Sequence, residues 1–193
     1  MQLRAVNIVP KMGALPLSHM GHRYDLMPVL EQLGGLGTAT YVNLAPNKVF
    51  DVVEQQEVIA QQWGYPHINF TCFERVGDLL YKICCEHIFD KLNIVVGQDR
   101  VRWGERIVHG IVNRTFKEYE SDLSNVKLNI VVPETYKLRG LSGTTMREAA
   151  MLGDFDCFRA HLGPMFNQDD TMYYFNKTRE AVVDGIIPVR RAK

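Results

Sequence analysis

Strand-like apolar segments alternate with helical patterns along most of this chain. An apolar run over residues 4–9 ends at Pro10, residues 22–33 have helical spacing, and residues 38–44 are β-branched and aromatic. Strands that alternate with helices of about 10–15 residues are typical of parallel βαβ units. The near-continuous apolar strand at residues 94–96 favours a sheet covered on both faces. We therefore expect an α/β fold, a Rossmann-like parallel sheet with helices on both faces and further helices towards the C-terminus.

The other element boundaries follow from the same periodicity and from Gly and Pro punctuation. Asp51 is a good N-cap residue for the helix that ends before Gly64. Expected strands are residues 4–9, 38–44, 67–73, 94–96 and 126–132. Expected helices are residues 22–33, 52–63, 78–92, a helix that includes Ile107 and Ile111, and residues 145–152, 155–161 and 170–183.

Length and composition limit the class of protein. A chain of 193 residues suits a single domain over residues 1–193, and 46% apolar with 23% charged residues is ordinary for a soluble globular protein. Lys and Arg (22) balance Asp and Glu (22), which argues against a nucleic-acid partner or a polybasic membrane anchor. No apolar run reaches the roughly 20 residues of a membrane span. We expect a cytoplasmic protein, with homo-oligomerisation left open.

The four cysteines, Cys72, Cys84, Cys85 and Cys157, have spacings that fit neither a zinc site nor a redox pair. They are therefore expected to be reduced thiols. The histidines outside the first motif likewise show no ligand spacing, so no protein-held metal is expected. These histidines are His67, His87, His109 and His161.

A His-x-Gly-His motif, His19 to His22, follows the first expected strand and enters the first helix. At this spacing both imidazoles can face one side, next to the free N–H groups of the helix start. Imidazole donors at a helix N-terminus can bind phosphate oxygens, and Gly21 would let a ligand approach the backbone. The plainer interpretation is a turn with two surface histidines.

A second motif follows the expected strand at residues 126–132. Ser142, Thr144 and Thr145 place hydroxyls and backbone amides at a helix start, and Arg147 projects from its first turn. Such an arrangement can bind an anion. It can equally be a capping box with Thr144 or Thr145 as the N-cap, and the two interpretations are compatible.

Two further segments follow strand ends, where ligands bind in sheets of this kind. Lys48, in the loop after residues 38–44, could reach over phosphates as a point charge. Gly97 would let a nucleotide cross the end of the strand at residues 94–96, and Asp99 could accept ribose hydroxyls. The alternatives are a solvated loop lysine and a turn in which Asp99 is an N-cap.

These motifs resemble those of the nucleotidylyltransferase superfamily, the adenylyl- and cytidylyltransferases with a His-x-Gly-His motif. The first loop is similar over Gly13-Ala-Leu-Pro-Leu-Ser-His-Met-Gly-His22, and the family's Ile-Ser-Ser-Thr-x-x-Arg signature resembles Leu141-Ser-Gly-Thr-Thr-Met-Arg147. Gly97-Gln-Asp-Arg-Val101 and residues 143–158 are similar to bacteriophage-type members. The order and spacing cover residues 4–160.

The resemblance implies transfer of a nucleoside monophosphate from a nucleoside triphosphate, preferably ATP, to a phosphate-bearing acceptor. The best acceptor by analogy is nicotinamide mononucleotide, and Mg²⁺ arrives with the nucleotide. His19 and His22 would hold the triphosphate and Lys48 would cover its α-phosphate. Ser142, Thr144 and Arg147 would grip the β- and γ-phosphates.

Three alternatives stay open at this point. The first is a cytidylyltransferase that acts on a phospho-alcohol or a sugar phosphate. The second is a non-catalytic nucleotide-binding module that kept the pocket. The third, a redox protein on a dinucleotide fold, is disfavoured because no Gly-x-Gly-x-x-Gly follows the first strand.

Overall fold

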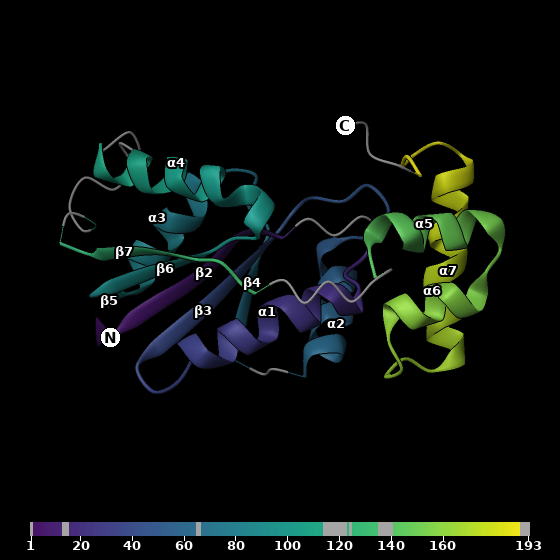
Figure 1. The fold of residues 1–193 in the computed structure, drawn as a ribbon, viewed down its shortest axis with the longest axis horizontal. Coiled ribbons are helices and arrows are strands. Elements are labelled where there is room, and N and C mark those ends of the chain that lie inside the picture. Colours follow the sequence, from purple (N-terminus) through teal and green to yellow (C-terminus); the bar gives the residue numbers. More distant parts are fainter. Residues whose placement is uncertain are drawn as a thin grey trace. The chain divides into compact units, whose positions relative to one another are not determined.

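A computed structural model describes residues 2–12, 16–64, 67–113, 123, 125–134 and 141–189. The chain forms two compact units. Unit 1 comprises Met1–Met12, Pro28–Ala45 and His67–Thr135, and unit 2 comprises Gly13–Met27, Pro46–Pro66 and Tyr136–Lys193. The strands in Figure 1 all belong to unit 1, whereas α5, α6 and α7 belong to unit 2.

Unit 1 is built on a parallel sheet. Its five strands lie in the order β4-β3-β2-β6-β7 and each neighbouring pair is parallel. The chain moves outwards from β2 through β3 to β4 and then crosses back to place β6 on the other side of β2. The strands are β2 (Ala5–Met12), β3 (Thr38–Leu44), β4 (Ile68–Thr71), β6 (Lys91–Val95) and β7 (Lys127–Val131). The order reverses between β2 and β6, so the carboxyl ends of these two strands form the switch point where ligands bind in open α/β sheets.

The helix predicted over residues 78–92 was too long. The structure ends α3 (Val76–Glu86) earlier, and the following residues form β5 (Ile88–Phe89) and β6. Strand β5 pairs with β1 (Gln2–Leu3) in a small parallel sheet. A short apolar run does not by itself distinguish a buried strand from a helix, and here strand pairing decides between them.

One face of the main sheet forms the apolar core of unit 1. This face packs against α3 and α4 (Val101–Val112), which follows a short 3-10 turn, η1 (Gln98–Arg100). Gly104 lets α4 lie close to the sheet, since a Cβ there would be 3.2 Å from Val96 Cγ2. The buried residues of this core include Val6, Ile8, Leu79, Ile83, Leu92, Ile94 and Ile107.

The opposite face carries a hydrogen-bonded row of asparagines. Asn129 donates to Asn93 (3.2 Å), and Asn93 donates to Asn7 (2.7 Å). Asn7 in turn donates to the carbonyl oxygen of Leu33 (3.2 Å), the last residue of α1 (Met20–Leu33). The end of α1 therefore lies on this second face, and the expected α/β class with helices flanking a parallel sheet is confirmed.

Unit 2 is helical around an aromatic core. It contains the first two turns of α1 together with α2 (Val52–Trp63), α5 (Gly143–Leu152), α6 (Phe155–Leu162) and α7 (Gln168–Val183). Helix α2 confirms the predicted cap, because Asp51 accepts from Glu54 N and Glu54 accepts from Asp51 N, each at 2.9 Å. The core residues include Leu17, Phe50, Met146, Phe158, Phe166 and Phe175.

The four cysteines are free, as expected. Within the described ranges, no helix is both long enough and apolar enough to cross a membrane.

Candidate functional site

The His-x-Gly-His motif forms the entry to α1 in unit 2. His22 N donates to His19 O at 2.9 Å, which closes the turn before the helix. The imidazole rings of His19 and His22 stack with centroids 4.0 Å apart, and Ser18 Oγ lies 3.5 Å from His22 Nδ1. The two imidazoles are thus paired side by side, as the spacing predicts.

Gly21 is required by the packing of this turn. A Cβ at this position would lie 2.8 Å from His19 Nδ1 and 3.1 Å from the carbonyl oxygen of Leu141. The close approach to Gly21 is therefore made by the protein itself, through the His19 ring and the residue that precedes the second motif. This contact brings the two sequence motifs together in one place.

The second motif caps α5, but not as predicted. The N-cap is Ser142, not Thr144 or Thr145, because Ser142 Oγ accepts from Thr145 N at 3.1 Å. Ser142 Oγ and Thr145 Oγ1 also share a hydrogen bond of 2.9 Å. Helix α5 therefore begins at Gly143, two residues before the predicted start at Thr145.

Arg147 is buried, with only 2% of its surface exposed. Its Nη2 donates to Thr144 Oγ1 at 3.2 Å, and its Nε donates to the carbonyl oxygen of Val189 at 2.9 Å. The guanidinium is therefore held between the first turn of α5 and the segment after α7.

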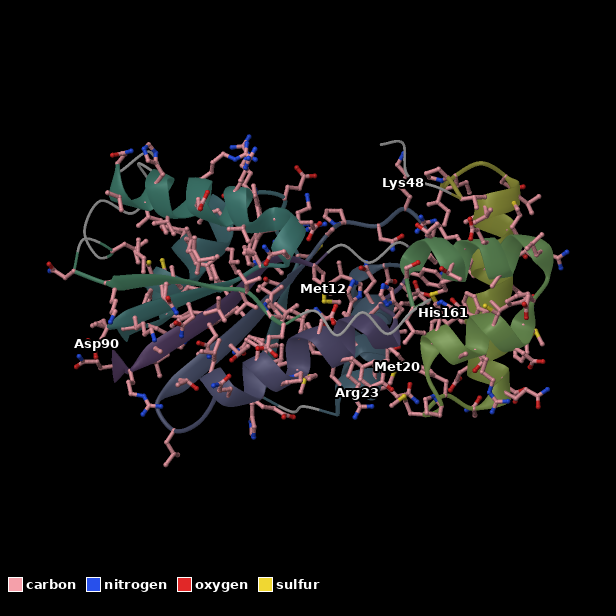
Figure 2. The ribbon with its side chains drawn as sticks, in the orientation of Figure 1. Met12, Met20, Arg23, Lys48, Asp90 and His161 are labelled. Carbon is pink, nitrogen blue, oxygen red and sulfur yellow. The ribbon has the colours of Figure 1, made fainter. Side chains whose placement is uncertain are left out.

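His161 joins this cluster, although no motif in the sequence predicts that it lies here. It lies on α6 (Figure 2), is 4% exposed, and its Nδ1 lies 2.8 Å from the carbonyl oxygen of Cys157. The buried side chain of Gln62 donates to Ser18 O (3.1 Å) and to Leu162 O (2.8 Å), which fixes α6 beside the motif turn. Only this tertiary packing, and no local pattern, brings His161 to the motif.

The electrostatic environment of His19 favours an anion. Burial, together with the electrostatic effects of His22, His161 and Arg147, lowers the pKa of His19 from 6.5 to about 2. His19 Nδ1 is buried and has no hydrogen-bond partner among the described residues. The charges that affect this imidazole are thus all cationic, and an anion placed here would satisfy them together.

Lys48 lies in an ordered loop of the same unit. Asn47 accepts from Val49 N (2.7 Å) and Phe50 N (3.2 Å) and donates to the carbonyl oxygen of Pro16 in the motif loop. Lys48 itself is exposed at the surface of this loop. Gly13, the first residue of the motif segment, lies outside the described residues.

Gly97 and Asp99 belong to unit 1. Gly97 precedes η1, and a Cβ on it would lie 2.8 Å from Asp99 Oδ1. Asp99 is not the N-cap of α4, because it lies inside η1 and forms an ion pair with Arg100 at 3.8 Å. This turn forms one side of a groove at the carboxyl ends of β2 and β6.

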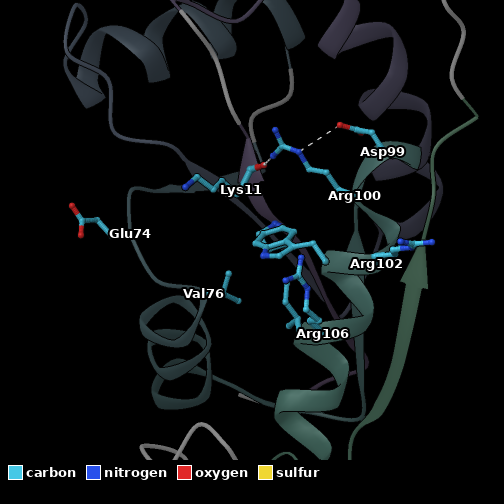
Figure 3. A pocket seen from close by; sticks show the side chains of 10 residues that line it. Lys11, Glu74, Val76, Asp99, Arg100, Arg102 and Arg106 are labelled. Carbon is cyan, nitrogen blue, oxygen red and sulfur yellow. Dashed lines mark hydrogen bonds and ion pairs between the residues drawn. The ribbon is translucent and has the colours of Figure 1, made fainter. Parts of the chain in front are cut away.

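The groove in unit 1 has a volume of about 900 Å³ and is rich in cations (Figure 3). Arg100 donates to the carbonyl oxygen of Lys11 at 3.1 Å. Among the described residues, no carboxylate forms an ion pair with Lys11, Arg102 or Arg106. The lining residues are Pro10, Lys11, Glu74, Val76, Asp99, Arg100, Arg102, Trp103, Arg106 and Ile107. Cations without a carboxylate partner in the described part of the chain, beside an indole ring, can bind an anionic ligand with an aromatic group.

Within the described ranges, no group of three or more His, Cys, Asp or Glu side chains could hold a metal ion. Mg²⁺ prefers oxygen ligands, whereas the cluster around His19 offers imidazoles and a guanidinium.

Comparison with known proteins gives little further information. No family model matches the chain, and no curated protein matches it. Among solved structures, TmcAL from Thermotoga maritima bound with alpha-thio ATP is similar with a TM-score of 0.47 and 11% sequence identity. The match covers 95% of this chain but 57% of the TmcAL chain, so this chain spans a little over half of that protein's length.

Proposed function

We propose that this chain is a nucleotidylyltransferase that binds a nucleoside triphosphate, preferably ATP, at the cationic cluster of unit 2. One observation carries the proposal: His19 is buried among His22, His161 and Arg147, directly beside the capped start of α5. A polyphosphate is the class of ligand that can bind several cations and a helix N-terminus at the same time.

The proposed reaction is an in-line displacement at phosphorus. A phosphate oxygen of the acceptor attacks the α-phosphorus, and a new phosphorus–oxygen bond forms. The bond from the α-phosphorus to the bridging oxygen breaks, and pyrophosphate leaves with that electron pair. The residues of the cluster contribute by positioning and by charge stabilisation, without a covalent intermediate.

Each site residue has a definite task in this proposal. His19 and His22 donate to the triphosphate, and Lys48 covers its α-phosphate. Ser142, Thr144, Thr145 and Arg147 hold the β- and γ-phosphates. Mg²⁺ enters as a counter-ion carried by the phosphates, since the cluster has no carboxylate ligands for it.

We infer that the groove of unit 1 binds a phosphate-bearing ligand with a planar ring. Lys11, Arg102 and Arg106 would bind its phosphate, and Trp103 would contact the ring. Nicotinamide mononucleotide carries both groups, whereas a phospho-alcohol would make no contact with the indole.

An assay of pyrophosphate release tests the reaction and identifies both substrates. The assay supplies Mg²⁺, each of ATP, CTP, GTP and UTP, and phosphate-bearing acceptors that include nicotinamide mononucleotide. We expect release with one triphosphate and one acceptor, and a loss on the order of 10²–10³ in rate for His22→Ala. Preference for CTP would favour the cytidylyltransferase alternative.

A paired variant tests the ligand assigned to the groove. Arg106→Gln should raise the Kd for nicotinamide mononucleotide while leaving the Kd for tripolyphosphate unchanged. Arg179→Gln, an exposed arginine on α7, is the charge-matched control and should change neither. Equal effects of the two variants would contradict the assignment.

A non-catalytic nucleotide-binding module is the second candidate. The burial of Arg147 favours it, because a guanidinium that is 2% exposed and already bonded to Thr144 and Val189 is occupied by protein groups and is not poised to stabilise a transition state. Triphosphate binding without turnover across the acceptor panel would support this alternative.

A further inference from the structure

The segment after α7 turns back onto the cluster residue Arg147. Gly185 has a φ of 70°, in the left-handed region that ends many helices, and its N–H bonds to Val182 O at 3.2 Å. The chain reverses there, and Ile187 N then donates to Ala181 O at 3.1 Å. We name residues 185–189 the strap.

The strap is held by a small apolar contact. Ile187 is 3% exposed and packs with Ala181 and Val182, and both Val49 and Val189 pack against this group. Val49 adjoins Lys48 in the loop that Asn47 orders. One small cluster therefore connects the strap to the loop that carries Lys48.

The strap also occupies the guanidinium of Arg147. Arg147 Nε donates to the carbonyl oxygen of Val189 at 2.9 Å, and the side chain is almost completely buried. A carbonyl is a neutral acceptor, whereas hydrogen bonds from a guanidinium to a phosphate oxygen are charge-assisted and roughly twice as strong. A phosphate that reaches Arg147 can therefore replace the strap carbonyl.

We propose that the strap is a latch that competes with polyphosphate for Arg147, and that a bound polyphosphate releases Ile187 and Val189 from the body of unit 2. This inference rests on the proposed function to the extent that the cluster binds phosphate. While the latch is closed, Arg147 is shielded and the Lys48 loop is tied to α7. Once it opens, both cations can engage the ligand.

Amide hydrogen exchange of the unmodified protein tests the latch directly. The probe is inorganic tripolyphosphate, which needs no base recognition and no turnover. Because Ile187 N–H donates to Ala181 O of α7 when the strap is docked, release of the strap by saturating tripolyphosphate should accelerate its exchange by at least about tenfold. Unchanged or slower exchange with tripolyphosphate bound would overturn the latch while leaving the anion site intact.

Two neighbouring isoleucines provide a matched pair of variants. Ile187→Ala weakens the docked strap and should tighten tripolyphosphate binding by at least about threefold, since more of the protein is already open. Ile186→Ala changes a side chain that is 50% exposed and should leave the affinity unchanged. Weaker binding by Ile187→Ala would instead make the strap a support for Arg147.

The outcomes separate the latch from the function on which it rests. If tripolyphosphate binds neither the unmodified protein nor Ile187→Ala, then the anion site fails and the proposed function fails with it. If it binds both equally and Ile187 exchange does not change, then only the latch fails. Thermal unfolding of both variants confirms that each is folded.

Discussion

His19 shows how a single side chain can be prepared for a ligand. Removing an imidazole from water disfavours its charged form, and neighbouring cations disfavour it further. His19 has both influences, so it is neutral and its buried Nδ1 has no partner among the described residues. A bound polyphosphate would place negative charge beside the ring and raise the pKa of His19.

Gly21 offers the sharpest test at this scale. In Gly21→Ala the new methyl group would lie 2.8 Å from His19 Nδ1 and 3.1 Å from Leu141 O, so the His19 ring must move. We expect tripolyphosphate affinity to fall by at least about tenfold, the equivalent of one lost charge-assisted hydrogen bond. Isothermal titration calorimetry measures this change. An unchanged affinity in a folded variant would show that the position of the His19 ring does not matter for binding.

At the scale of elements, local signals explain what the sequence predicted correctly. The capping box of α2 involves only Asp51 and Glu54, which are close in sequence, so its position could be read directly. The start of α5 was misplaced because three neighbouring hydroxyl residues could each be the N-cap. In the structure Ser142 is the N-cap, because its Oγ accepts a hydrogen bond from Thr145 N. The end of α3 was misplaced because a strand pairing, which is not local, decides it.

The two caps in unit 2 make a matched comparison. Ser142→Ala and Asp51→Ala each remove one cap, and each should lower the free energy of unfolding by about 1 kcal/mol. Only Ser142 lies in the cluster beside Arg147, so only Ser142→Ala should weaken tripolyphosphate binding as well. Urea unfolding and calorimetry measure the two quantities. Equal binding losses in both variants would assign the effect to stability and not to the site.

At the scale of the whole molecule, the site depends on contacts that no sequence pattern shows. The parallel sheet and its switch point follow from the alternation of elements, which fixed the expected region for ligands. His161 and Gln62, in contrast, reach the motif turn through packing of α2 and α6. The cations of the groove, Arg102 and Arg106, are ordinary helix-surface residues until the fold places them beside Lys11.

The neutral His19 also has a consequence for the stability of the whole protein. Its pKa is about 2 in the folded state against 6.5 for a free imidazole, so between these pH values the unfolded chain binds a proton that the folded chain does not. Stability therefore rises with pH in this window and is lost as the pH falls below 6.5. From pH 7 to pH 5 the loss that His19 causes should be about 2 kcal/mol.

Urea unfolding at pH 5, 6 and 7 tests this linkage, and the comparison between variants is the decisive quantity. Other groups also titrate: burial raises the pKa of Asp25, which acts with the opposite sign at the acid end, whereas hydrogen bonds from Lys82 and Tyr41 lower that of Glu86. These contributions persist in His19→Gln, so the difference in slope between that variant and the unmodified protein isolates His19. His109→Gln, at an exposed histidine of α4, is the control variant, because it removes a histidine without changing the cluster. If His19→Gln keeps the slope of the unmodified protein, the pKa of His19 is not lowered on folding, and the buried neutral imidazole described above is wrong.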